Sequence, residues 1–127
     1  MGLIVLDTSV LIDNLRGVPE AAAALDNAEA SGLRLAASVL TKVELLSGMR
    51  AHEKRTTREL VDALNWVPVS DDIADRAGAH ARSYRRSHPG IGVVDVVIAA
   101  TVEHLGAALW THNVRHYPMF ADLVAPY

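Results

Sequence analysis

The predicted fold is decided by residues 2–9, which read Gly2-Leu3-Ile4-Val5-Leu6-Asp7-Thr8-Ser9. Four consecutive apolar residues run directly into a carboxylate and two hydroxyls. A short unbroken apolar run is typical of a strand that is buried on both faces at the centre of a parallel sheet. Ligands of open α/β sheets gather at the carboxyl ends of the strands. We therefore expect Asp7 to lie at the functional edge of a sheet.

Strands and helices alternate along the rest of the sequence. Beyond the first strand, we expect extended segments at 33–37, 66–69 and 107–111, and a last short strand near 123–125. The expected helices are 9–15, 20–30, one from Ser38 or Thr41 to Met49, 53–65, a long one that Ser70 caps and His88-Pro89-Gly90 ends, and 93–105, which Gly106 ends. This alternation predicts an α/β fold in three layers, α/β/α, with a short parallel sheet. No repeat or change of composition divides the chain, so we expect one domain over residues 1–127.

The composition excludes several classes of protein. Of 127 residues, 50% are hydrophobic and 21% are charged, as in a globular rather than a disordered chain. No apolar run approaches the ~20 residues needed to span a bilayer, and no secretory signal is evident at the start. The absence of cysteine excludes disulfides and thiolate metal sites, and we expect a cytoplasmic protein without a membrane partner. The net charge of −3 neither indicates nor excludes a nucleic-acid ligand.

Three acidic residues lie in apolar surroundings, where an ionised carboxylate is costly unless it is paired. Asp7 follows the first strand, Glu44 lies within Val43-Glu44-Leu45-Leu46, and Asp95 lies within an apolar run at 93–100. Each has a structural explanation when it is taken singly. Asp7 could cap the helix that follows it, and Asp95 could occupy the first turn of a helix. Glu44 could complete a capping box with Thr41.

Taken together, the three acids favour a functional explanation. All of them lie near a boundary between a strand end and a helix, which is the same edge of a parallel sheet. Carboxylates that are brought together repel one another unless a cation neutralises them. Oxygen-rich acidic sites suit Mg²⁺ or Mn²⁺, which also bind substrate phosphates. The pattern therefore favours metal-assisted phosphodiester chemistry.

Four stretches of the sequence resemble the motifs of the PIN domain, and more closely those of the VapC-type toxins of toxin–antitoxin pairs. They are Leu6-Asp7-Thr8-Ser9-Val10-Leu11-Ile12, Ser38-Val39-Leu40-Thr41-Lys42-Val43-Glu44-Leu45, Asp95-Val96-Val97-Ile98-Ala99-Ala100-Thr101 and Thr111-His112-Asn113-Val114-Arg115-His116-Tyr117. One such stretch would be weak evidence, because short motifs match often by chance. Four in the family's order, over essentially the whole chain, form a specific resemblance.

The resemblance implies an endoribonuclease that depends on Mg²⁺ or Mn²⁺, the toxin of a type II toxin–antitoxin system. Its RNA would be cleaved by a metal-activated water to leave a 5′-phosphate and a 3′-hydroxyl. It also implies a homodimer that a cognate VapB-type antitoxin holds inactive. By matching position, Asp7, Glu44 and Asp95 would bind the metal, and Thr8 and Ser9 would support the first of them.

The sequence departs from the family pattern after the last apolar strand. Family members often place a fourth acid there, and this chain offers Asn113 and His116 instead. Asn113 can hold a metal-bound water or a neighbouring carboxylate as part of the catalytic group, and we expect His116 to bond locally beside it. Three carboxylates favour a single firmly held ion. The alternative is a catalytically weak or inactive PIN-like module that binds RNA or protein.

Two further features are open to two explanations each. Arg82, Arg85 and Arg86 crowd the end of a predicted helix, where they either complement the helix dipole or contact RNA phosphates, and Arg115 is a further candidate for RNA contact. The apolar faces of 40–49 and 60–64 either pack in the core or form a groove for an antitoxin helix.

Overall fold

The computed structural model describes residues 2–127 and contains a single four-stranded sheet in which all neighbouring strands are parallel. The strands are β1 (Leu3–Leu6), β2 (Arg34–Ser38), β3 (Asn65–Val67) and β4 (Ala108–Trp110), in the order β3-β2-β1-β4. β1 lies between two neighbours, with Val5 opposite Ala36 of β2 and Leu109 of β4. The expectation of a central buried first strand is therefore confirmed.

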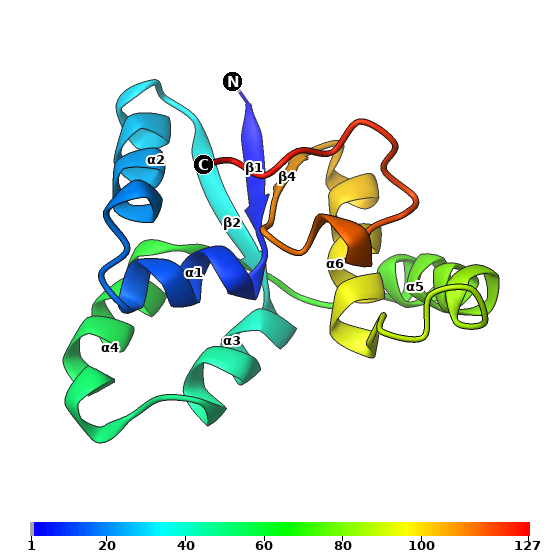
Figure 1. Cartoon of the computed structure of the whole chain (residues 1–127), viewed down its shortest axis with the longest axis horizontal. Coiled ribbons are helices and arrows are strands. Elements are labelled where there is room, and N and C mark those ends of the chain that lie inside the picture. The colour runs from blue at the N-terminus through cyan, green and yellow to red at the C-terminus, as the bar shows by residue number, and fades with distance from the viewer. Residues whose placement is uncertain (1) are drawn as a thin grey trace.

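Helices cover both faces of the sheet, which confirms the three-layer α/β/α arrangement (Figure 1). In Figure 1, α1, α2 and α4 lie on one side of the strands, and α5 and α6 lie on the other. The helices are α1 (Thr8–Leu15), α2 (Pro19–Ala30), α3 (Val39–Ser47), α4 (Lys54–Ala63), α5 (Asp71–Tyr84) and α6 (Val93–Leu105), with short 3-10 turns at Ala51–Glu53 and Val114–His116. None of these helices is long and apolar enough to cross a membrane, over the residues described.

The alternation of side chains along β1 builds a separate core on each face of the sheet. Ile4 and Leu6 pack with apolar residues of α1, α2 and α3, while Val5 packs against Ile98 of α6 on the other face. Successive side chains of a strand point to opposite faces, so a continuous apolar run is what a strand covered on both sides requires. The first stretch of the sequence therefore fixes where both helical layers attach.

The outer helix α5 packs chiefly against α6. Ile73 and Ala77 of α5 are buried against α6, whereas Ala81 and Tyr84, which follow them at helical spacing, are only half-buried. Two histidine–carboxylate pairs fasten the helices at their surface, His80–Glu103 at 2.7 Å and Asp72–His104 at 2.8 Å. The pair of helices is thus held by a narrow apolar seam with polar contacts beside it.

Two local predictions are wrong. No strand forms near 123–125, because Leu123 packs into the core beside α6, Val124 is 75% exposed, and Pro126 has no N–H group to give to a sheet. The capping box of Thr41 and Glu44 does not form either. Ser38 is the N-cap of α3 and accepts a hydrogen bond from the Leu40 amide, so the helix begins earlier and Glu44 lies within it.

Two glycines provide a matched test of this backbone. Gly106 ends α6 with φ of +61°, and Gly78 lies inside α5; a Cβ added at either would meet nothing within 4 Å. Gly78→Ala should raise the free energy of unfolding by about 0.5–1 kcal/mol, because alanine restricts the unfolded chain and suits a helix. Gly106→Ala should lower it by about 1–2 kcal/mol, because the left-handed conformation is strained for a residue with a Cβ. Urea unfolding of both variants measures the difference, and equal stabilities would contradict the assigned helix end.

Candidate active site

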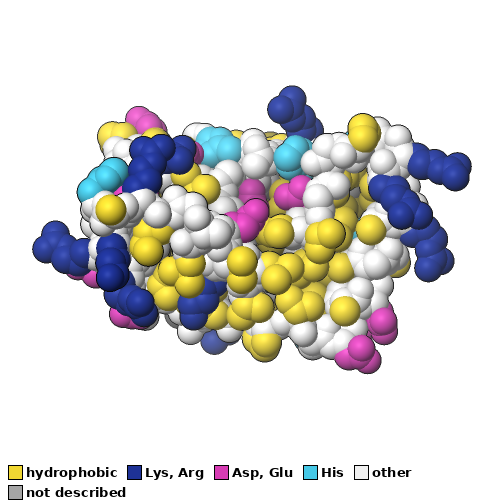
Figure 2. Space-filling model, turned by 90° about the horizontal axis from the view of Figure 1, so that it is seen from below, with side chains coloured by type: hydrophobic (Ala, Val, Ile, Leu, Met, Phe, Trp, Pro, Cys, Tyr) yellow, Lys and Arg dark blue, Asp and Glu magenta, His cyan; other side chains and the backbone are white. Residues whose placement is uncertain are grey.

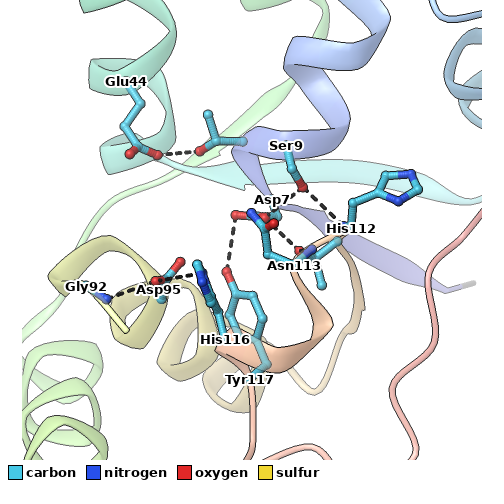
Figure 3. A network of polar contacts seen from close by, with 11 residues as sticks. Asp7, Ser9, Glu44, Gly92, Asp95, His112, Asn113, His116 and Tyr117 are labelled. Carbon is cyan, nitrogen blue, oxygen red and sulfur yellow. Dashed lines mark hydrogen bonds and ion pairs between the residues drawn. The ribbon is translucent and has the colours of Figure 1, made fainter. Parts of the chain in front are cut away.

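Asp7 leaves the end of β1 with only 3% of its surface exposed, and hydroxyl groups surround its carboxylate (Figure 3). Ser9 and Thr111 both donate to Oδ2, at 2.9 and 2.7 Å, and the Tyr117 hydroxyl donates to Oδ1 at 3.1 Å. Asp7 is the N-cap of α1 by position, but its side chain makes no capping hydrogen bond. A structural capping role for this carboxylate is therefore wrong.

Two of the three donors to Asp7 are not evident from the sequence pattern. Thr111 follows β4, the parallel neighbour of β1, and Tyr117 follows the 3-10 turn, with only 1% of its surface exposed. Burial, followed by the nearby charge of Asp7, raises the pKa of the Tyr117 hydroxyl far above its usual value of 10.0. Tyr117 consequently keeps its proton and remains a donor to the carboxylate. The position of Thr111 at the carboxyl end of a strand is the one feature that could have indicated its role.

Glu44 reaches the site from α3. Its Oε1 accepts a short hydrogen bond from the Thr8 hydroxyl, which also lies 3.5 Å from the hydroxyl of buried Thr41. Figure 3 shows this carboxylate directed toward the end of β1 from the facing helix. Thr8 therefore supports Glu44 rather than Asp7, while Ser9 supports Asp7 as the resemblance implied.

Asp95 reaches the site from the first turn of α6. Its Oδ2 accepts a hydrogen bond from the Gly92 amide at 2.9 Å and lies 3.3 Å from Nδ1 of His116. The structural explanation of Asp95 as a first-turn acid thus holds, and a site role is compatible with it. Burial is the main cause that raises the pKa of this carboxyl above its usual value, and the charge of Asp7 acts in the same direction. The local contact expected of His116 is confirmed.

These acids line one open cavity of about 470 Å³. Its walls are formed by Asp7, Thr8, Ser9, Ile12, Asp13, Glu44, Asp95, Asn113 and His116. Figure 2, which looks onto this face, shows acidic side chains at its centre, hydrophobic ones beside them, and Lys and Arg toward its two ends. The residues expected at the site therefore come together, and Asp13, four residues beyond Ser9 on α1, adds an acid that the sequence reading missed.

The open cavity has room for a divalent cation that keeps some of its water ligands. Within residues 2–127, no three His, Asp or Glu side chains converge closely enough to hold a metal ion together. Mg²⁺ typically keeps several waters and takes only one or two carboxylates directly. A cavity of this size, lined largely by carboxylate and hydroxyl groups, leaves room for those waters. Carboxylate and hydroxyl oxygens of this kind are the ligands that suit Mg²⁺ or Mn²⁺.

The basic candidates divide into two groups. Arg82 lies in α5, Arg85 and Arg86 follow it, and these three exposed residues are not among those that line the acidic cavity. Arg115 lies in the 3-10 turn between Val114 and His116 and lines a neighbouring cavity. The Asn113 amide donates to Thr111 Oγ1 at 2.9 Å, which fixes the start of that turn beside Asp7.

Comparison with known proteins agrees with this geometry. Residues 4–119 match the PIN domain family. The chain is 46% identical to ribonuclease VapC19 of Mycobacterium tuberculosis, over 96% of this chain and 98% of the relative. It is 43% identical to ribonuclease VapC10 of the same organism, over 98% and 93% of the two chains.

A solved structure extends the agreement to the whole fold. A chain from a toxin–antitoxin complex of Klebsiella pneumoniae superposes with a TM-score of 0.81 at 30% identity, covering 98% of each chain. The family match and the two curated relatives each span nearly the whole described chain. The chain therefore belongs to the PIN domain family and, within it, to the VapC group.

Proposed function

We propose that this chain is the toxin of a type II toxin–antitoxin system and acts as an endoribonuclease that depends on Mg²⁺ or Mn²⁺. The observation that carries the proposal is the cavity into which three separate elements send Asp7, Glu44 and Asp95. The relatives named ribonuclease VapC19 and VapC10 support the choice of RNA as substrate. The ion, when bound, would supply a Lewis acid that activates water and stabilises negative charge on the phosphate.

The side chains of the cavity have different proposed roles in binding the ion and the RNA. Asp7 is held in one orientation by its three hydroxyl donors, which suits it to be the most firmly placed ligand. Glu44 is exposed and held chiefly by Thr8, so it can adjust when the ion and RNA bind. Asn113 and His116 carry no negative charge, although they line the same cavity as the acids. We propose that they contact the phosphate oxygens of the RNA.

A protein partner fits the surface beside the acids. The expected core face of α3 is only partly buried, since Leu45 is enclosed but Val43 is 61% and Leu46 is 44% exposed. A smaller cavity of about 80 Å³ lies beside this surface, where Ile12, Leu15 and Leu45 are joined by polar residues, and it shares Glu44 with the acidic cavity. A VapB-type antitoxin segment would cover this apolar surface, as the toxin–antitoxin complex among the neighbours suggests. By family resemblance we also propose a homodimer.

The main test is RNA cleavage by the purified chain. Asp7→Asn and Asp95→Asn should each reduce cleavage in Mg²⁺ or Mn²⁺ by more than about a hundredfold. Loss of a residue that only hydrogen-bonds to a metal ligand typically costs about 10–100-fold. Asp26→Asn, which alters an exposed acid on α2, should leave cleavage unchanged. Circular dichroism confirms that each variant is folded. Full activity in Asp7→Asn, or cleavage that persists in EDTA, would refute the proposed chemistry.

Metal binding can be measured apart from cleavage. Calorimetry with Mn²⁺ should find one ion per chain, because Asp7, Glu44 and Asp95 line one cavity and Asn113 brings no charge to it. Tyr117→Phe should weaken Mn²⁺ binding by about tenfold, because one donor that orients Asp7 is lost. Tyr84→Phe, a half-buried tyrosine of α5, is the matched control. A folded chain that binds RNA but holds no Mn²⁺ would instead support the alternative of a binding module.

A further inference from the structure

A second cavity lies beside the acidic one, and its walls carry positive charge in place of negative. Its volume is about 290 Å³, and its lining residues are His88, Gly90, Ile91, Arg115 and His116. His116 belongs to the walls of both cavities. Among residues 2–127, no aspartate or glutamate lines the second cavity, and the guanidinium of Arg115 provides the only permanent charge there.

The short 3-10 turn at Val114–His116 places the positively charged cavity next to the acidic cavity. Arg115 and His116 are consecutive, and the turn begins at Asn113, which lines the acidic cavity. His116 Nδ1 faces Asp95 at 3.3 Å on the acidic side. Its Nε2 lies on the Gly90 side, where a Cβ added to Gly90 would come within 3.9 Å of it. One imidazole therefore separates the two cavities.

The loop after α5 provides the opposite wall. His88 Nδ1 pairs with the Ser87 hydroxyl at 2.7 Å, which leaves Nε2 as the ring atom that can contact a ligand. The Ile91 amide donates to the His88 carbonyl at 3.1 Å, so the turn that carries Gly90 is closed by its own backbone. Glycine at 90 leaves the Nε2 edge of His116 open to the cavity. Polar side chains from two separate segments thus line one space.

We propose that this second cavity binds a phosphodiester group of the RNA strand adjacent to the one that is cleaved. The inference rests on the proposed ribonuclease function. RNA carries a negative charge at every nucleotide, and an acidic cavity repels it unless neighbouring cations hold the strand. A cavity that shares a wall with the acidic one can hold the next phosphate while the scissile phosphate lies among the acids. Arg115 provides the charge and fixed hydrogen-bond donors, and the two imidazoles line the same space.

The test measures RNA binding without cleavage. The affinity of the purified chain for a short single-stranded RNA is determined in EDTA between 50 mM and 1 M salt. For single strands, each phosphate contact contributes about 0.7 to the slope of log K against log salt. Arg115→Ala should reduce the slope by about that amount and weaken binding about eightfold at 50 mM salt, uniformly across RNA sequences. Arg34→Ala is the control, because Arg34 is exposed at the start of β2, at the opposite edge of the sheet.

A second arm identifies the phosphate concerned. In Mg²⁺ or Mn²⁺, a dinucleotide offers only the scissile phosphodiester, and the same dinucleotide with one added terminal phosphate offers a neighbour at one end. The added phosphate, at the 5′ or the 3′ end, should lower KM for the unchanged chain and give no advantage to Arg115→Ala.

Each outcome separates the two proposals. An unchanged salt slope in folded Arg115→Ala, or a failure of the unchanged chain to bind RNA in EDTA, would overturn the phosphate subsite while cleavage stands. An altered slope with no cleavage under any metal would uphold the subsite as an RNA contact and overturn the ribonuclease function. An equal loss in Arg34→Ala would show that only general charge matters, which also overturns the subsite.

Discussion

The structure depends on one buried charge, the carboxylate of Asp7 at the end of the central strand. A carboxylate that is 3% exposed must be compensated by hydrogen bonds, because its desolvation would otherwise cost several kcal/mol. The donors come from α1, from the end of β4 and from the segment after the 3-10 turn, so Ser9, Thr111 and Tyr117 join distant parts of the chain at one point. The bonds that orient Asp7, the proposed metal ligand, therefore also hold the segment from Thr111 to Tyr117 against the end of β1.

The three principal acids differ in how far they are removed from water. Asp7 is buried, Asp95 is half-buried, and Glu44 is exposed. In the described residues, no three His, Asp or Glu side chains lie close enough to hold a metal ion together. This separation limits the repulsion between the carboxylates. Burial raises the pKa of the Asp95 carboxyl, and the charge of Asp7 raises it further. A divalent cation would relieve the repulsion between these carboxylates.

The sequence predicted the parts of the fold and site that short-range patterns control. The apolar run before Asp7 indicated a central strand, and the acids at strand–helix boundaries indicated one shared edge, because parallel topology brings those boundaries together. Tyr117 could not be found in this way, since its bond to Asp7 spans 110 positions and depends on how the chain returns after β4. Glu44 matched a capping box equally well, and only the earlier start of α3 at Val39, capped by Ser38, excludes it.

Local placement of charge explains how a chain with a net charge of −3 can suit an RNA ligand. Net charge describes the long-range field, whereas a bound phosphate responds mainly to groups within about a Debye length, roughly 8 Å at physiological salt. On this face the acids line one cavity and Arg115 lines the next, with His116 between them. The cation that the acids attract and the phosphate that Arg115 attracts would then lie on the two sides of one side chain. The proposed binding of RNA would therefore rest on alternation of charge at this edge of the sheet rather than on a basic surface.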